Sequence, residues 1–408
     1  MTYNPPTATM TALDAAIGPA PMHTHSASAL ASSWVEVSLP ALRRNFRTIQ
    51  SQVGPEVNVC PVIKSDAYGH GAIGCALGLR DAGAKWFAVS TTEEGVALRK
   101  NGIQERVLVL SGFWPGEEEE IVQHQLTPAV WQRGQVELLE KRAERLNPSH
   151  RPGLHLKINT GMNRLGADRQ DLENIFEAVR QSPHIFLEGI FSHYASSEIV
   201  NLPDGDEQLR RFREAVAVAE RMGLEVPLRH MANSAALTSR PQAWFNLVRP
   251  GLAVYGYCLP LTSAVRGHAV PGGLALEPAL TWKARVRQVR DVPAGEQVGY
   301  SSGHITRSLT RVAIVPVGYG DGLSRRLSSR GRMIVRGAYA PILGNVSMNL
   351  TALDVTGIPG VCVGDEVTVL GRAQSCEISA LEHASVASTI PYEILCNISG
   401  RLPRKYVE

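Results

Sequence analysis

The sequence lacks the runs of residues that mark membrane proteins and nucleic-acid-binding proteins. Its 408 residues are 44% hydrophobic and 19% charged, with a formal net charge of +3. No stretch approaches the roughly 18–20 consecutive apolar residues of a membrane-spanning helix, and no cluster of Lys and Arg resembles a nucleic-acid-binding patch. We therefore expect neither a membrane nor a nucleic acid as partner. A chain of this length predicts more than one domain.

Cysteine is scarce, and its spacing indicates neither a disulfide framework nor a metal site. None of the six cysteines forms a C-x-x-C pair, and most lie in or beside apolar runs. Such cysteines are typical of buried free thiols in a reducing compartment, so we predict a cytoplasmic protein without a bound metal. Residues 1–33 lack the basic start and continuous apolar core of a secretory signal. We expect a flexible N-terminal extension there.

Between residues 57 and 255, short apolar runs alternate with longer helical patterns. Strands that are almost wholly apolar are typical of a parallel sheet covered by helices, and eight strands are the number that closes a (β/α)8 barrel. An open doubly wound sheet is the alternative. The predicted strands are Val57–Ile63, Trp86–Ser90, Val107–Ser111, Thr127–Trp131, Leu154–Asn159, Leu187–Ser192, Leu228–Met231 and Leu247–Tyr255. The helices predicted between them include Thr92–Lys100, Gln135–Arg145, Gln170–Gln181 and Gln208–Met222.

After about residue 260 the long helical patterns disappear and short strands dominate, which predicts a C-terminal domain that is mainly β. Trp34–Ser38 precedes the barrel by a helical stretch, Pro40–Gly54, and is a candidate strand for the sheet of this domain. We divide the α/β chain into the extension 1–33, a barrel 34–262 and a β domain 263–408. The strands predicted in the β domain are Leu280–Val289, Arg311–Val317, Arg332–Arg336, Ala340–Ile342, Thr351–Val355 and Glu366–Leu370.

A lysine, Lys64, ends the first predicted barrel strand. Burying an ammonium group costs several kcal/mol unless the charge is paired or neutralised. Barrel enzymes carry their reacting groups at the C-terminal ends of the strands, and a desolvated lysine can attack an aldehyde to form a Schiff base. On its position alone, Lys64 is either such a reactive lysine or one whose stem reaches out to solvent.

Five motifs favour the reactive lysine, because together they resemble the alanine racemase family in order and spacing. The resemblance runs from about residue 34 to the C-terminus. The family fold is a barrel that binds pyridoxal 5′-phosphate (PLP), followed by a β domain, which agrees with the pattern of predicted elements. The motifs are VIKSDAYGHG (62–71), LKINTGMNRLG (156–166), VRPGLAVYG (248–256), VGY (298–300) and GYGDG (318–322).

The resemblance implies racemisation of alanine by two bases, with PLP bound to Lys64 as a Schiff base, and a supply of D-alanine for peptidoglycan. Lys64 matches the base on the D face, and Tyr300 matches the tyrosine on the opposite face. Arg249 matches the arginine that faces the pyridine nitrogen of PLP. Because a guanidinium only donates hydrogen bonds, it would keep this nitrogen unprotonated. That weakens the electron sink and should suppress side reactions such as transamination.

The phosphate of PLP needs hydrogen-bond donors, which barrels often provide from the loops after the last two strands. Here these loops contain Ser234, Gly251 and Leu252. Tyr68 resembles a family tyrosine that adds a phenolic hydroxyl, and His193 resembles the histidine that packs on the cofactor ring. These five residues complete the expected cofactor-binding set.

A second lysine, Lys157, lies on an apolar barrel strand. Strand alternation directs it inward if Leu154 and Leu156 point outward. In many family members the matching lysine is carbamylated, which turns a buried cation into an anion that holds a nearby arginine. Arg164 matches that arginine, which contacts the phenolic oxygen of PLP and the carboxylate of the substrate.

Met348 and Tyr319 match family residues at the substrate carboxylate. Together with Tyr300, the matching residues of related enzymes reach the barrel of the partner subunit, so the resemblance implies a C2 homodimer with two shared active sites. The sequence departs from the usual C-M-D around Met348, since it has Ser347 and Asn349. These two residues resemble the broad-specificity amino acid racemases, which are our alternative function.

Gly400 stands where some relatives have a bulky tyrosine, so we expect some turnover of L-serine beside L-alanine. Two other classes remain, a PLP-dependent amino acid decarboxylase and a non-catalytic PLP-binding barrel. Tyr300 and Arg249 argue against the decarboxylase, which would pair the pyridine nitrogen with a carboxylate. The β domain that carries Tyr300 and Met348 argues against the non-catalytic barrel.

Overall fold

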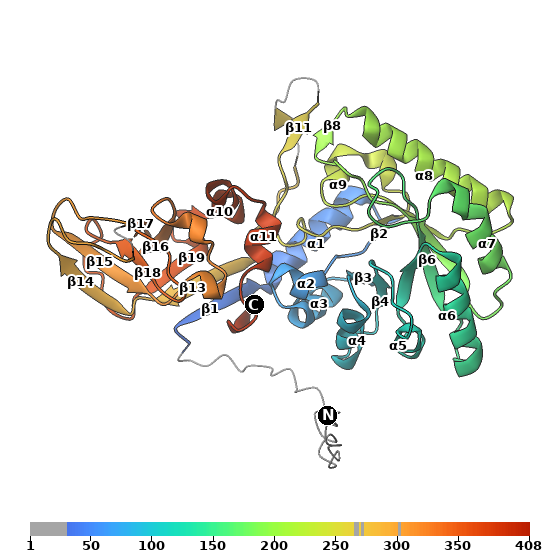
Figure 1. Cartoon of the computed structure of the whole chain (residues 1–408), viewed down its shortest axis with the longest axis horizontal. Coiled ribbons are helices and arrows are strands. Elements are labelled where there is room, and N and C mark those ends of the chain that lie inside the picture. The colour runs from blue at the N-terminus through green and yellow to red at the C-terminus, as the bar shows by residue number, and fades with distance from the viewer. Residues whose placement is uncertain (1–30, 265–268, 271–272, 301–302) are drawn as a thin grey trace, which may run out of the picture.

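The computed structural model describes residues 31–264, 269–270, 273–300 and 303–408. Figure 1 shows two lobes side by side, a barrel of alternating strands and helices and a lobe formed mainly of strands. The predicted extension, residues 1–33, lies outside the described residues except for its last three. Within the described ranges, no helix is long and apolar enough to cross a membrane.

Eight short parallel strands form the barrel, as the sequence predicted. Six of the strands are paired in the order β3-β4-β5-β6-β7-β9, and the other two, β10 and β2, pair with each other. The ring closes through the Val62–Ala88 bridge on one side, and through the hydrogen bond from the Arg249 amide to the Ala232 carbonyl (2.9 Å) on the other. The alternative of an open sheet is thereby excluded. The strands are β2 (Asn58–Val59), β3 (Trp86–Val89), β4 (Arg106–Val109), β5 (Thr127–Val130), β6 (Gly153–Lys157), β7 (Phe186–Phe191), β9 (Leu228–His230) and β10 (Leu247–Val248).

Amphipathic helices cover the outside of the barrel. In α7, Leu172, Ile175, Phe176 and Val179 are buried at the spacing of one helix face, which is the pattern that packs a helix against a core. The predicted helix Thr92–Lys100 matches α4, which begins with a capping box between Thr91 and Glu94. The longer helices are α1 (Leu39–Val53), α3 (Ala72–Asp81), α4 (Thr92–Lys100), α5 (Glu118–Gln123), α6 (Arg133–Leu146), α7 (Leu172–Arg180) and α8 (Pro203–Arg221). The short ones are α2 (Lys64–Tyr68), η1 (Arg169–Asp171), α9 (Ala236–Ser239) and η2 (Pro241–Ala243).

The second lobe contains a sheet in the order β14-β15-β18-β17-β16-β19-β13-β1-β21, with β20 beside β19. β1 (Ser33–Ser38), from the N-terminal side of the barrel, lies antiparallel to β13 and parallel to β21 in this sheet. Ser38 then caps α1 by accepting a hydrogen bond from the Ala41 amide (3.2 Å), so β1 leads directly into the barrel. The other strands are β13 (Leu280–Arg285), β14 (Gln288–Val292), β15 (Thr310–Val315), β16 (Arg332–Val335), β17 (Ala338–Leu343), β18 (Thr351–Asp354), β19 (Glu366–Ala373), β20 (Cys376–Ile378) and β21 (Arg404–Val407).

Four predictions of local structure were wrong. Val57–Ile63 is a strand only at Asn58–Val59. Leu247–Tyr255 is a strand only at its first two residues, because the rest forms a buried series of turns. Leu280–Val289 is two strands, β13 and β14, rather than one. The C-terminal part also contains helices, which the sequence did not predict. They are η3 (Tyr319–Asp321), η4 (Arg325–Leu327), α10 (Ala380–Ala387) and α11 (Pro391–Cys396).

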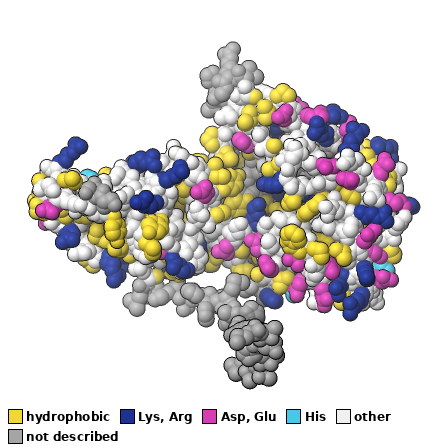
Figure 2. Space-filling model, viewed as in Figure 1, with side chains coloured by type: hydrophobic (Ala, Val, Ile, Leu, Met, Phe, Trp, Pro, Cys, Tyr) yellow, Lys and Arg dark blue, Asp and Glu magenta, His cyan; other side chains and the backbone are white. Residues whose placement is uncertain are grey.

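A small third sheet, formed by β8 (Ile199–Val200), β11 (Leu261–Ser263) and β12 (Ala269–Val270), projects beside the barrel (Figure 1). Figure 2 shows hydrophobic side chains gathered where the two lobes meet. Over the rest of that face, positive and negative side chains are interspersed rather than segregated (Figure 2).

Candidate active site

Lys64 lies at the C-terminal end of the first barrel strand, at the start of an unusual left-handed turn. The next four residues, Ser65 to Tyr68, all have φ between 51° and 54° although none is glycine. This conformation costs about 1–2 kcal/mol per residue, so other groups must hold it. The Glu94 carboxylate accepts from the Ser65 amide (2.6 Å), and the Asp66 carboxylate accepts from the Ala72 amide (2.7 Å). The backbone that carries Lys64 is thus fixed from two sides.

Cationic side chains from several strand ends gather around Lys64. Burial, and then the charge of Arg164, lower the pKa of Lys64, while Glu94 opposes this change. Burial, followed by Arg249, Arg164 and Lys64, lowers the pKa of Lys157 to about 8. A lysine with a lowered pKa is a better nucleophile and base at neutral pH. The pocket at the barrel mouth therefore suits an anionic ligand and a reactive amine.

Lys157 points into the barrel, as strand alternation predicted. Its ammonium lies 5.5 Å from the centre of the Phe191 ring, and the Arg249 guanidinium lies 5.1 Å from the same ring. His193 follows β7 at the same end of the barrel. Burial, and then Arg249, lower the pKa of His193 to about 3, so its imidazole is neutral over the physiological range.

Arg249 is 3% exposed and is held by neighbours on two strands. Its Nη1 lies 2.6 Å from Nδ1 of His230, and its Nη2 donates to the Ser192 carbonyl (2.7 Å). Burial lowers the pKa of Arg249 to about 10, which leaves the guanidinium protonated at neutral pH. It can therefore act only as a donor toward a ligand.

Ser234, Gly251, Leu252 and Tyr68 come together where β9 and β10 end. The Ser234 hydroxyl accepts hydrogen bonds from the amides of Gly251 (2.9 Å) and Ala253 (3.2 Å). A side chain at Gly251 would place its Cβ 2.4 Å from the Tyr68 hydroxyl oxygen. Glycine at this position allows the Tyr68 hydroxyl to approach the turn this closely. The turn thus brings hydroxyl and amide groups together as a cradle, and groups of this kind bind small anions in other proteins.

Tyr300, Tyr319 and Met348 lie on adjacent loops of the second lobe and are 70%, 45% and 57% exposed. The Tyr319 amide donates to the Ser347 carbonyl (3.0 Å), and the Asn345 side chain donates to the Tyr300 carbonyl (3.1 Å). Within the described part of a single chain, no interaction joins these three side chains to Lys64 or to the other cations of the barrel mouth. One chain therefore divides the expected site into two separate halves.

The sequence interpretation missed four polar residues near the site: Glu94, His155, Glu188 and His230. One signal for His155 was available, because it stands two residues before Lys157 on the same strand and must face the same way. Glu94 carried a signal as the last member of a capping box. Glu188 and His230 carried none, since their contacts arise only when the barrel closes.

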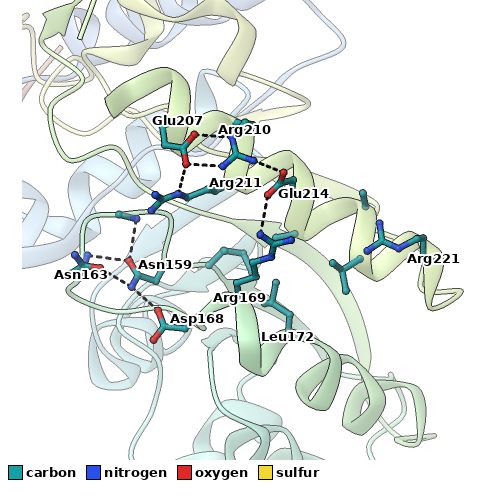
Figure 3. Close-up of a pocket in the computed structure, with 15 residues that line it drawn as sticks. Asn159, Asn163, Asp168, Arg169, Leu172, Glu207, Arg210, Arg211, Glu214 and Arg221 are labelled. Carbon is teal, nitrogen blue, oxygen red and sulfur yellow. Dashed lines mark hydrogen bonds and ion pairs between the residues drawn. The ribbon is translucent and has the colours of Figure 1, made fainter. Parts of the chain in front are cut away.

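A different cavity, of about 600 Å³, lies between α8 and the segment that contains η1. Figure 3 shows Arg210 directed at both Glu207 and Glu214 on α8. Arg211 also pairs with Glu207 (2.8 Å). Since these carboxylates already neutralise the arginines, the cavity offers less free positive charge than the barrel mouth. The mouth remains the candidate active site.

The reactive lysine and its cationic surroundings stand where barrel enzymes carry their catalytic groups. They place the chain among barrel enzymes that act on anionic ligands through a lysine. Two family models cover most of the sequence: "Alanine racemase, N-terminal domain" matches residues 37–259, and "Alanine racemase, C-terminal domain" matches residues 279–406. The chain belongs to the alanine racemase family and is an enzyme of that family.

Individual relatives agree with this assignment. The alanine racemase of Syntrophobacter fumaroxidans is 41% identical over 90% of this chain and 96% of its own length. That of Geobacter sulfurreducens is 40% identical over 91% and 96%. The crystal structure of alanine racemase from Streptomyces lavendulae superposes with a TM-score of 0.84 at 34% identity, over 92% of this chain and 97% of that one. The Bartonella henselae enzyme, solved with covalently bound pyridoxal phosphate, gives a TM-score of 0.79 at 28% identity, over 92% and 100%.

Proposed function

We propose that this enzyme interconverts L-alanine and D-alanine with PLP bound at Lys64, and that it supplies D-alanine for peptidoglycan in the cytoplasm. The observation that carries the proposal is the position of Lys64. It is a lysine of lowered pKa, fixed at a strand end by Glu94 and surrounded by cations. Family membership supports the same reaction, since the relatives named above are alanine racemases.

The residues at the barrel mouth fit PLP. Ser234, Gly251, Leu252 and Tyr68 form the cradle we assign to its phosphate, and the close approach of the Tyr68 hydroxyl to Gly251 supports this assignment. We assign the ring nitrogen to Arg249 and a face of the ring to His193. When bound, PLP delocalises the negative charge that remains after the α-proton is removed.

Racemisation requires a proton to leave one face of the α-carbon and another to arrive at the opposite face. We assign the first face to the amine of Lys64, which acts as a base when unprotonated. We assign the other face to Tyr300 of the partner subunit, because Tyr300 is 70% exposed and lies in the separate half-site. Tyr319 and Met348 beside it would then help to bind the substrate carboxylate. Each active site of the homodimer would be complete only across the subunit interface.

Arg164 and Lys157 form the remaining part of the proposal. Arg164 would bind the substrate carboxylate, for which a guanidinium has the right charge and geometry. The lowered pKa of Lys157, about 8, leaves a useful fraction of neutral amine that can add to CO₂. We propose that Lys157 carries this carbamate, whose negative charge would offset the surrounding Arg164, Arg249 and Lys64. Density beyond the amine nitrogen would support the carbamate, and clean density for a free amine would refute it.

Hybrid dimers test the function and the shared site together. Lys64→Ala and Tyr300→Phe should each be inactive in racemisation, measured by chiral analysis of alanine. After random exchange between the two inactive variants, half of the dimers contain one subunit of each. Each mixed dimer has one intact site and one site with both substitutions. About a quarter of the wild-type activity should therefore return. No recovery from well-exchanged dimers would refute the shared site. Release of CO₂ instead of racemisation by the wild type would indicate a decarboxylase.

A broad-specificity amino acid racemase is the second candidate. One observation favours it: a Cβ built on Gly400 has no atom within 4 Å, so space is open where some relatives have tyrosine. The exposed Asn349 in place of the usual aspartate also removes a negative charge near Met348. Comparing turnover of L-serine, L-lysine and L-arginine with that of L-alanine distinguishes the two candidates. A serine rate lower than the alanine rate by about three orders of magnitude, or about 4 kcal/mol, would leave alanine as the substrate.

A further inference from the structure

A line of buried polar groups crosses the barrel interior below the proposed cofactor site. It passes from Arg249 to His230, then to His155, Glu188 and Arg106. Nη1 of Arg249 lies 2.6 Å from Nδ1 of His230, and Nε2 of His230 lies 2.8 Å from Nδ1 of His155. Nε2 of His155 lies 3.7 Å from the Glu188 carboxylate, which also pairs with Arg106. Arg249 directly follows β10, and the other residues lie on β9, β6, β7 and β4, so the line exists only in the closed barrel.

The charge of Arg249 gives the line a direction. A guanidinium only donates, so Nδ1 of His230 must accept and the proton of that ring must be on Nε2. That proton can then be donated only to Nδ1 of His155, which places the His155 proton on its own Nε2. This last N–H faces the Glu188 carboxylate. Every donor along the line therefore points away from Arg249 and toward the carboxylate.

Both imidazoles must be neutral for the line to exist. A proton on Nδ1 of His230 would oppose the N–H of Arg249, and a charged His155 would oppose the N–H of His230. Burial, and then the charge of Arg249, lower the pKa of His155 to about 3 and that of His230 well below its usual range. Hydrogen bonding and burial thus favour the same protonation state.

The far end of the line is a specific site rather than a chance contact. Glu188 is 4% exposed, and the Thr127 hydroxyl donates to its carboxylate (3.1 Å). Arg106 reaches it from the open, N-terminal end of the barrel, where half of the Arg106 side chain is exposed. A Cβ at Gly189 would lie 3.0 Å from Nε2 of His155, so glycine at this position leaves room for the ring.

We propose that Glu188 and His155 are positioning residues, which act through His230 to hold the guanidinium of Arg249 in one orientation. Nε2 of His155 makes no hydrogen bond within the described residues, so the Glu188 carboxylate, 3.7 Å away, acts on this N–H through its charge. The two hydrogen bonds that join Arg249, His230 and His155 strengthen each other. Nδ1 of His230 thereby becomes a better acceptor for Arg249. The effect on a cofactor rests on the proposed function, whereas the protonation pattern of the two rings does not.

The protonation pattern can be measured directly. In holoenzyme labelled with ¹⁵N-histidine, the nitrogen spectrum should show both His155 and His230 as neutral rings with the proton on Nε2, unchanged from pH 6 to pH 9. His155→Gln and His230→Gln identify the two signals. A proton on Nδ1, or a charged ring, at either residue would refute the proposed direction.

A pair of matched variants tests the action on Arg249. Glu188→Gln removes the charge but keeps the shape, and should lower kcat about tenfold with little change in KM, and shift the visible absorbance of bound PLP. Glu140→Gln is the control, since the Glu140 carboxylate also pairs with a histidine, His184 (2.7 Å), but outside the barrel interior. It should change neither kcat nor the absorbance. Equal effects of the two variants would refute the positioning role. A wild-type protein without racemase activity would refute the proposed function instead. The nitrogen spectrum of His155 and His230 would still test the proposed protonation pattern.

If Glu188→Gln fails to fold, Arg106→Gln gives the same test from the exposed end of the line. It removes the partner of the Glu188 carboxylate without placing a new group in the interior. We expect a shift of the PLP absorbance in the opposite direction, because a Glu188 carboxylate without its arginine partner attracts the His155 N–H more strongly. An unchanged absorbance together with unchanged kcat would count against the proposal.

Discussion

Replacing Lys157 by methionine should stabilise the enzyme without its cofactor at neutral pH. Lys157 is 7% exposed and has a pKa of about 8 in the folded protein, against an ordinary value of 10.5. Because folding lowers this pKa, the charged lysine opposes folding. This loss of folding free energy is fully present below pH 8. The free energy of unfolding should rise as the pH increases from about 8 to 10.5, because over this range the unfolded chain binds more protons at Lys157 than the folded protein does.

The two pKa values set the size of the effect. The cost of the charged amine is about 3 kcal/mol at pH 7 and about 1.4 kcal/mol at pH 9.5. Lys157→Met removes this cost and has a similar volume. Its packing in the barrel adds a further contribution that does not depend on pH. The difference between wild type and variant should therefore shrink by about 2 kcal/mol between the two pH values, whatever the packing contributes.

Urea unfolding of both proteins without PLP, in CO₂-free buffer, measures this difference. Adding bicarbonate at pH 8 should then stabilise the wild type but not Lys157→Met, because only a neutral amine forms the carbamate. Lys141→Met is a suitable control, since that lysine lies on the outer helix α6. A difference between wild type and Lys157→Met that is constant from pH 7 to pH 9.5 would refute the lowered pKa.

Three further predictions concern the cradle, the substrate pocket and the half-site on the second lobe. Gly251→Ala should raise the dissociation constant of PLP at least about tenfold, because its Cβ would lie 2.4 Å from the Tyr68 hydroxyl; equilibrium dialysis measures it, and unchanged affinity would contradict the cradle. Gly400→Tyr should lower the ratio of serine to alanine turnover, and an unchanged ratio in a chiral assay would place the side-chain pocket elsewhere. Tyr300→Phe should abolish racemisation while α-proton exchange of one alanine enantiomer in D₂O continues at Lys64; loss of exchange for both enantiomers would contradict the two-base assignment.

The barrel could be predicted because each of its strands is a short apolar run between amphipathic helices. The same rule failed at Leu247–Tyr255, where an equally apolar run is buried as turns. Burial alone does not distinguish a strand from a turn that is enclosed by other elements. The short helices α10 and α11 were missed because six or eight residues among strands show too little periodicity.

The site was predictable to the extent that its residues lie within sequence motifs. Lys64, Arg249 and Gly251 were proposed in this way, and the structure brings them to one end of the barrel. The line from Arg249 to Glu188 was not predictable, because it joins strands that are distant in the chain. Its residues come into contact only when the barrel closes, and no local sequence pattern predicts those contacts.

The position of β1 has a consequence for biosynthesis. β1 contacts β13, and the Ser33 hydroxyl donates to the carbonyl of Lys283, 250 residues later in the chain. The ribosome therefore releases β1 long before its partners in the sheet exist. The barrel must form while this strand, with its buried Val35 and Val37, has no sheet to join. Its protection in the nascent chain then falls to chaperones or to transient contacts with the barrel, and the second lobe made alone would lack the strand between β13 and β21.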